Sequence, residues 1–322
     1  MRSLPHLLGA LAVVVTAGGL LGVQATHAPV PARDRRPIEV AITVDDLTRP
    51  PFEPAFEPPA SVVGRLLEAF ARHHLPPVTG FLNGATSEGH AEDRAALGRW
   101  LAAGNLLGNH TFSHLDLARV DVATFLADID RNELELERIS GAPTPGRDWR
   151  VFRYPFLQEG ATESTREAVR AHLRERGYRI AEVTIDFEDW EWFPAYARCS
   201  GEGSERGVSE LRARYREAAR VELLAADALA RDLFGRPIRQ ILLLHVGGFT
   251  AEMIEDLLQE YEALGVRFIS LDDALADSAY HVDPRIARGY GSPFLYQVEA
   301  ARGVTPKATP WPPHGELAAI CR

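Results

Sequence analysis

The chain has 322 residues, is 46% hydrophobic and carries a formal net charge of −10 at pH 7. This length and apolar content suffice for one large core, for which a single α/β domain of roughly 250 residues is the default. The negative charge, together with the absence of a basic stripe in the sequence, argues against nucleic acid as a partner.

The N-terminus has the pattern of an export signal. Arg2 precedes an uncharged apolar stretch over residues 7–23, and small residues follow around Ala25 and Ala28. This order predicts a signal peptide over residues 1–28, and the alternative is an uncleaved membrane anchor. Because the stretch lies near the short limit for a span, its length favours cleavage. We therefore expect a periplasmic or secreted protein with no further integral membrane segment.

Strand and helix patterns alternate along the chain after a linker over residues 29–37. Apolar runs predict buried strands over residues 38–44, 78–82, 106–107, 151–152, 180–185, 238–244 and 266–269. An amphipathic stripe predicts a first helix that Ser61 caps. Similar stripes predict further helices over residues 92–103, 122–139, 163–176, 211–233 and 250–264. About seven such units favour an α/β fold, a distorted (β/α) barrel of parallel strands, over an open sheet. The predicted domain spans residues 38–278.

The remaining residues, 279–322, form a tail rich in proline and glycine. It contains Cys321, and the second of the two cysteines is Cys199. Export permits a disulfide between them, and the alternative is two unpaired thiols. A disulfide here would hold the tail and take no part in catalysis.

Two adjacent carboxylates, Asp45 and Asp46, follow the first predicted strand. An Asp pair often does no more than cap a turn. It can also divide catalytic work, with one carboxylate binding a metal ion while the other accepts a proton from water. The pair alone leaves both interpretations open.

His110 and His114 follow the third predicted strand, four residues apart. This spacing predicts that both imidazoles lie on one face of a helical turn, which is a common metal-binding arrangement. The alternative is a pair of partly buried histidines bonded to the backbone. Together with Asp46, the two histidines would make a set of three ligands with coordination positions left for water and substrate.

Three further polar residues lie at or near the ends of predicted strands. Arg153 needs a carboxylate partner, for which Asp45 is the natural candidate, and the alternative is a surface salt bridge. Asp189 either orients a histidine, with Trp190 as an apolar wall, or caps a helix beside a core aromatic. His245 ends a buried strand at the edge where barrels carry their catalytic groups, which favours a functional role.

In order along the chain, these clusters resemble the motifs of the polysaccharide deacetylase family, also called the NodB-homology domain or carbohydrate esterase family 4. The family motifs T-F-D-D, H-S/T-x-x-H, R-x-P-Y, D-x-x-D-W and L-x-H are similar to residues 43–46 (TVDD), 110–114 (HTFSH), 153–156 (RYPF), 186–190 (DFEDW) and 243–245 (LLH). The resemblance covers about residues 38–275. Each motif is weak by itself, and five in the right order are a strong signal.

The resemblance implies a distorted (β/α) barrel that binds one divalent metal ion. The ion would most commonly be Zn²⁺, with Co²⁺, Ni²⁺ or Mn²⁺ as alternatives. Asp46, His110 and His114 would be its ligands. Asp45 would be the general base and His245 the general acid.

The same resemblance assigns supporting roles to the other motif residues. Arg153 would hold Asp45, and Asp189 would tune His245. Phe156 would supply a backbone N–H to the oxyanion, and Trp190 and Leu243 would line the acetyl pocket.

Two motif positions depart from the family pattern. Leu47 replaces the usual glycine after the Asp pair, and Phe156 replaces the usual tyrosine of the third motif. The tyrosine acts through its backbone N–H, so Phe156 is compatible with activity. Leu47 and the segment 50–59 alter the rim of the expected cleft, and this affects which substrates fit.

The sequence thus predicts an exported, metal-dependent hydrolase that removes the N-acetyl group from an acetylated amino sugar in a polysaccharide or oligosaccharide, chitin-like or peptidoglycan-like. A second hypothesis keeps the metal site but assigns it to an O-acetyl ester or a non-sugar amide. A third hypothesis is a catalytically silent carbohydrate-binding module. The presence of Asp45 and His245 disfavours the third.

Overall fold

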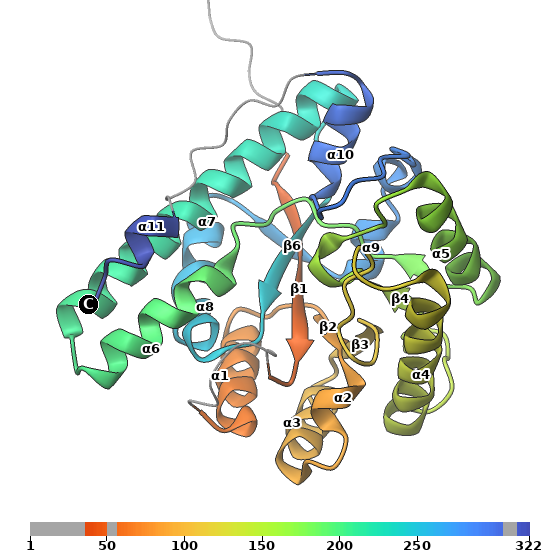
Figure 1. Cartoon of the computed structure of the whole chain (residues 1–322). Helices are drawn as coiled ribbons and strands as arrows, with labels where there is room; N and C mark the ends of the chain where they lie inside the picture. Colours follow the sequence, from red (N-terminus) through yellow and green to blue (C-terminus); the bar gives the residue numbers. More distant parts are fainter. Residues whose placement is uncertain (1–35, 50–56, 305–313) are drawn as a thin grey trace, which may run out of the picture. The chain divides into compact units, whose positions relative to one another are not determined.

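A seven-stranded parallel sheet forms the centre of the computed structural model (Figure 1). Its order is β5-β4-β3-β2-β1-β6, and β7 pairs with the first part of β1. The strands are β1 (Glu39–Leu47), β2 (Thr79–Leu82), β3 (Leu106–Asn109), β4 (Val151–Phe152), β5 (Arg179–Ile180), β6 (Gln240–His245) and β7 (Arg267–Ile269). Parallel pairing throughout means that all strands end at the same edge of the sheet.

The structure describes residues 36–49, 57–304 and 314–322. The predicted signal peptide, most of the linker 29–37 and most of the segment 50–59 lie outside these residues. Among the helices in the described part of the chain, none is long and apolar enough to cross a membrane.

The chain segment after β5 joins the two ends of the sheet and partly closes it into a barrel. Ile185 forms a parallel bridge with Leu242 of β6, and the Ile241 N–H donates to the Thr184 hydroxyl over 2.8 Å. This segment therefore connects the β4–β5 end of the sheet to β6 at its other end. The predicted α/β fold, a distorted barrel of about seven parallel strands, is confirmed.

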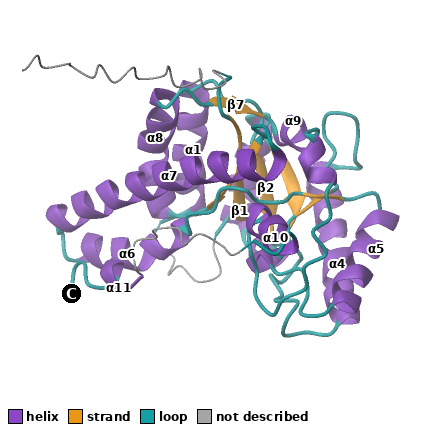
Figure 2. Ribbon diagram, turned by 90° about the horizontal axis from the view of Figure 1, so that it is seen from above, coloured by secondary structure: helices purple, strands orange, loops and turns teal. Residues whose placement is uncertain are grey.

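Helices surround this sheet (Figures 1 and 2). They are α1 (Pro59–Arg72), α2 (Gly84–Ser87), α3 (Ala91–Ala102), α4 (Val122–Ser140), α5 (Glu163–Glu175), α6 (Phe193–Gly201), α7 (Glu205–Phe234), α8 (Gly248–Ala263), α9 (Leu271–Leu275), α10 (Phe294–Ala301) and α11 (His314–Leu317). Three 3₁₀ turns, η1 (Pro155–Leu157), η2 (Asp189–Trp192) and η3 (Ser278–His281), lie in the connections.

The long helix α7 shows how the sequence pattern produces this packing. Leu211, Tyr215, Ala219 and Leu223 recur every four residues and are fully buried. This spacing places them on one helical stripe, which packs against α8. The Ser204 hydroxyl accepts a hydrogen bond from the Gly207 N–H and caps the start of the helix.

Several predicted boundaries are wrong. β1 extends to Leu47, so Asp45 and Asp46 lie within the strand and do not follow it, and α7 begins at Glu205 instead of residue 211. The first helix begins at Pro59, and Ser61 is not its cap, because proline fits the first helical position with its fixed φ and missing N–H. The fifth strand ends at Ile180 and does not continue to Ile185. Its apolar residues are buried, but only a single bridge to β6 replaces a strand ladder.

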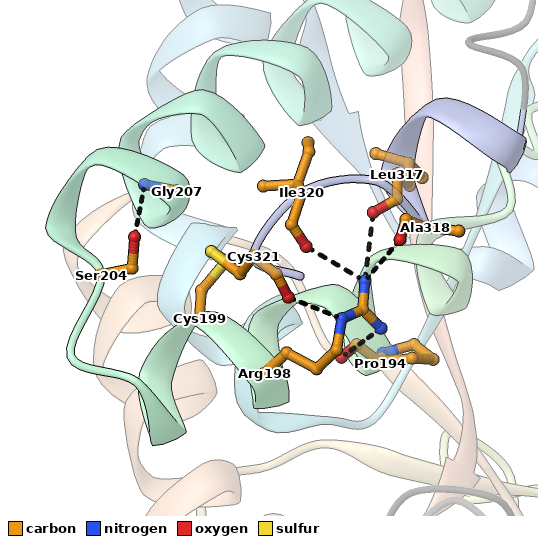
Figure 3. The surroundings of a disulfide bond; sticks show 9 residues. All are labelled: Pro194, Arg198, Cys199, Ser204, Gly207, Leu317, Ala318, Ile320 and Cys321. Atoms are coloured by element: carbon orange, nitrogen blue, oxygen red, sulfur yellow. Dashed lines mark hydrogen bonds between the residues drawn. A yellow bond between two sulfur atoms is a disulfide. The ribbon is translucent and has the colours of Figure 1, made fainter.

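Part of the tail 279–322 is packed on the domain. Phe294 at the start of α10 is fully buried, and its N–H donates to the Val183 carbonyl over 2.7 Å. The C-terminal residues are fixed by a disulfide between Cys199 of α6 and Cys321 (Figure 3). Beside it, the Arg198 guanidinium donates to the carbonyls of Leu317, Ile320 and Cys321.

Candidate active site

The predicted site residues gather at the carboxyl edge of the sheet. Asp45 and Asp46 lie near the end of β1, His110 directly follows β3, Arg153 directly follows β4, and His245 ends β6. Asp45 and His245 are register partners on neighbouring strands. The parallel topology thus brings together groups from four separate parts of the chain.

Asp46, His110 and His114 form a cluster suited to a metal ion. One ligand atom from each lies within 4.8 Å of the others. Asp46 Oδ1 is 3.4 Å from His114 Nε2 and 3.7 Å from His110 Nε2. The side chain of Asp46 turns toward the histidines because its backbone is left-handed, with φ of 61°, at an irregularity in the β1–β2 register.

The two histidines are not on a helical turn, and this prediction is wrong. Residues 110–114 form an irregular loop in which Thr111 and His114 have φ of 58° and 53°. Side chains replace the backbone bonds of a helix: Asn83 donates to the carbonyls of His110 and Thr111, and Asn109 accepts from the Thr111 N–H. The ring centroids still come within 5.0 Å of each other.

Both imidazoles are in the neutral form that a metal requires. Burial lowers the pKa of His110 to about 3, although a hydrogen bond from Nδ1 to the Arg153 carbonyl over 2.8 Å acts in the opposite direction. Burial also lowers the pKa of His114 to about 3, with a further contribution from the neighbouring His110. Because His110 donates through Nδ1, its Nε2 lone pair faces the two aspartates, Asp45 and Asp46.

Asp45 pairs with Arg153, as the sequence predicts. The Nη1 atom of Arg153 lies 3.1 Å and 3.3 Å from the two carboxylate oxygens, and both side chains are buried. Burial raises the pKa of Asp45, while the charge of Arg153 opposes this rise. Arg153 also donates to the Ala181 carbonyl and lies over the Phe81 ring, so its position is fixed from three sides.

Asp189 and His245 form a second buried pair. His245 Nδ1 donates to Asp189 Oδ1 over 2.7 Å, and the His245 N–H donates to Oδ2 over 2.9 Å. Burial by itself would lower the pKa of His245. The charge and hydrogen bond of Asp189, assisted by Asp46 and Asp45, outweigh burial and raise the pKa to about 9. His245 is therefore protonated at neutral pH, as a general acid must be.

The predicted substrate-binding residues border these groups. Phe156 is 56% exposed, and its ring centroid lies 4.5 Å from that of His114. Trp190 is half-buried in η2, next to Asp189. Leu243 is buried in β6, two residues before His245.

The cluster fits a divalent cation. Both oxygens of Asp46 are buried, and neither receives a hydrogen bond from any residue in the described ranges. Mainly because of burial, the pKa of this carboxyl group is raised to about 7. The charge of His245 lowers the pKa, whereas the charges of Asp45 and Asp189 raise it. A buried carboxylate without donors is costly, and a cation bound between it and two neutral imidazoles would remove that cost.

Two threonines that the sequence pattern did not single out bind these pairs. Thr43 Oγ1 accepts from Arg153 Nη2 over 3.2 Å, and Thr250 Oγ1 donates to Asp189 Oδ2 over 2.9 Å. Thr43 is the first residue of the motif at residues 43–46, so its place in that motif could have identified it as a site residue. Thr250 lies in the first turn of α8, and no sequence feature separates it from an ordinary threonine at a helix start.

Part of the chain matches a known protein family. Residues 32–181 match the family described as polysaccharide deacetylase. The match contains the first three motifs, and the fourth and fifth lie beyond it. The family comprises hydrolases of acetylated sugars. Among curated proteins, none matches the sequence significantly.

One solved structure supports the fold. A mutant of BA3943 from Bacillus anthracis, described as a CE4 family pseudoenzyme, superposes with a TM-score of 0.51 at 15% identity, over 74% of this chain and 67% of that chain. The chitin deacetylase of Colletotrichum lindemuthianum gives 0.49 at 21% identity, over 76% and 89%. The Bc1960 peptidoglycan N-acetylglucosamine deacetylase gives 0.49 at 22% identity, over 73% and 87%.

Proposed function

We propose that this protein is an exported, metal-dependent deacetylase that hydrolyses the N-acetyl group of an acetylated amino sugar in a polysaccharide or oligosaccharide. The observation that carries the proposal is the convergence of a three-ligand cluster, an Arg-held carboxylate and an Asp-held histidine at one edge of the sheet. A metal-bound water, a general base and a general acid together can hydrolyse an unactivated amide.

The ligand set for the ion is Asp46, His110 and His114. A divalent ion held by these residues supplies Lewis acidity toward the acetyl carbonyl and lowers the pKa of water. Three protein ligands leave a coordination position free, which is typical of catalytic rather than structural sites.

Asp45 is the proposed general base. It lies 3.6 Å from His110 Nε2, at the edge of the ligand cluster, and accepts a proton from the water that attacks the acetyl carbon. Arg153 keeps the carboxylate in place and favours its charged form. The added positive charge of an ion beside it opposes the rise in pKa that burial causes.

His245 is the proposed general acid. Its Nδ1 is occupied by Asp189, so Nε2 is the atom that delivers a proton to the departing amine. After deacetylation that amine leaves as a free amino sugar. Burial together with the hydrogen bond from Nδ1 to Asp189 fixes the ring, and this limits the reorganisation needed during transfer.

Phe156, Trp190 and Leu243 are proposed to contact the substrate. The backbone N–H of Phe156 would stabilise the developing oxyanion. Its exposed ring beside His114 offers an apolar face for a sugar ring. Trp190 and Leu243 would enclose the acetyl methyl group.

The hypothesis of a silent binding module has one point in its favour, since the BA3943 relative is described as a pseudoenzyme. In the present chain, however, each proposed catalytic side chain is present and bonded to its expected partner. This completeness favours a catalyst over a binding module.

The deciding experiment is acetate release from chitooligosaccharides, peptidoglycan and acetylated xylan, with and without a chelator. Release from the first two, lost on chelation and restored by Zn²⁺ or Co²⁺, would support the proposal. Release from xylan alone would favour an O-acetyl esterase. No release from any substrate by metal-loaded protein would contradict deacetylation of these polymers.

The proposed export rests on residues 1–28, which the structure does not describe. Expression of the full chain followed by N-terminal sequencing of the secreted form should give a start near Thr26 or Pro29. An intact Met1 in the membrane fraction would instead establish an anchor.

A further inference from the structure

The segment between η3 and α10 packs directly on the loop that carries Phe156. A Cβ atom added to Gly291 would lie 1.7 Å from the Phe156 carbonyl oxygen and 2.8 Å from the Leu157 carbonyl carbon. No side chain fits at this distance, so the close approach of the two backbones requires glycine. This segment belongs to residues 279–322, beyond the seven-stranded barrel and beyond the family match.

Hydrogen bonds on either side of Gly291 extend the contact. The Arg288 N–H donates to the Gly160 carbonyl over 3.1 Å. The Gln297 amide donates to Glu159 Oε1 and to the Ser292 carbonyl, each over 2.9 Å. Glu159 and Gln297 are both buried, so these bonds are shielded from water.

An ion-pair network that is largely buried, with Asp283 at its exposed end, supports the same loop. Arg166 of α5 binds Glu159 over 3.1 Å and Asp283 over 2.6 Å, which joins the loop to the C-terminal segment. Arg170 binds Glu159 over 2.6 Å and Glu182 over 3.0 Å. Glu159 is thus held from α5 and from α10 at once.

The loop needs this support because its backbone is strained. Phe156 and Leu157 have φ of 57° and 51°, in the left-handed region that residues with a side chain avoid. Two such residues in succession persist only where surrounding contacts determine the conformation. The same two residues are those against which Gly291 packs.

We infer that residues 283–297 form a clamp that holds the Phe156 loop in the geometry needed for catalysis. This inference rests on the proposed function, in which the Phe156 N–H stabilises the oxyanion. The clamp residues act through Phe156 and are positioning residues. The C-terminal segment is in this way a part of the active site and not an appendage to the barrel.

The test compares Gly291→Ala with Gly289→Ala. An added Cβ at Gly289 meets no atom within 4 Å, and its φ is not positive, so this variant is a matched control in the same segment. Metal content, kcat and KM on a chitooligosaccharide, and hydrogen exchange of the peptide covering residues 154–160 are measured for both variants and the unmodified protein.

For Gly291→Ala we expect faster exchange in residues 154–160 and a fall in kcat of roughly 10- to 100-fold, as a displaced oxyanion donor produces. Metal content should be unchanged, and Gly289→Ala should match the unmodified protein. Unchanged exchange in Gly291→Ala, or faster exchange with an unchanged kcat, would overturn the inference.

Two further outcomes are covered by the design. If Gly291→Ala does not fold, Gln297→Leu removes the bonds to Glu159 and Ser292 without adding bulk at Phe156, and it should give the same changes in milder form. If the unmodified protein shows no deacetylation, the proposed function fails, while exchange alone still decides whether the clamp holds the loop.

Discussion

Two adjacent aspartates in this site have different surroundings. Asp45 is bound by Arg153, whereas the buried oxygens of Asp46 lack donors among the described residues and face His110 and His114. Both carboxylates come within 3.7 Å of His110 Nε2, so distance to that atom alone does not separate them. The hydrogen-bond partners of each carboxylate differ, and this difference supports the proposal that Asp45 is the base and Asp46 a metal ligand.

This division predicts different outcomes for two single substitutions. Asp45→Asn should retain the metal ion and lower turnover by ~10² to 10⁴, the usual size of a general-base contribution. Asp46→Asn should weaken metal binding first, with part of the activity recovered at high Zn²⁺. Metal analysis and turnover on both variants check this. Loss of metal from Asp45→Asn but not from Asp46→Asn would reverse the assignment.

The Asp189–His245 pair predicts a change in pH dependence. His245 must be protonated to act as an acid, so activity should fall as pH rises through its pKa. Asp189→Asn removes the charge that raises this pKa, and burial then lowers it. The alkaline limb of the kcat profile should move to lower pH, with turnover at pH 8 reduced roughly 10- to 100-fold. An unshifted limb would show that another group is the acid.

At the level of elements, two of the proposed site residues lie in connections between strands and helices. Asp189 lies in η2, Phe156 lies in η1, and both 3₁₀ turns belong to loops between strands and helices. The C-terminal helix α11 contacts η2, and the disulfide joins α6, which follows η2, to the end of the chain. The last residues therefore support the turn that carries Asp189.

The disulfide should contribute measurably to stability. Cys199 and Cys321 are 122 residues apart, and a crosslink that closes so long a loop restricts the unfolded chain. Replacement of both cysteines by serine should lower the free energy of unfolding by about 2–4 kcal/mol. Denaturant unfolding with and without reductant measures this. The reduced protein should resemble the double variant, and equal midpoints for all forms would contradict the prediction.

At the level of the whole molecule, the proposed metal binding would be linked to folding. The ligands come from β1 and from the loop after β3, which meet only in the folded barrel. An ion that binds the folded state alone stabilises it by about 2.7 kcal/mol at one hundred times its Kd. Loading with Zn²⁺ should therefore raise the melting temperature, and a chelator should reverse the rise. His114→Ala should show little response, and an equal response would place the ion elsewhere.

The sequence by itself determined the order of strands and helices and the identity of the polar residues at the strand ends. Strands buried on both faces require continuous apolar runs, and helices on the barrel require stripes, so both leave a direct record in the chain. The Asp45–Arg153 pair was predicted for a similar reason, because a buried charge needs a partner of opposite charge. The Asp189–His245 pair was predicted from the family resemblance.

Only the tertiary structure decided how the site residues are held. The loop conformation at His110 and His114 depends on Asn83, which lies 27 positions before His110, and sequence spacing alone suggested a helical turn. The contact of Gly291 with Phe156 joins residues 135 positions apart, and a glycine in a proline-rich tail gives no local sign of it. Such contacts depend on where two backbones meet in space, and residue patterns record only what each segment needs locally.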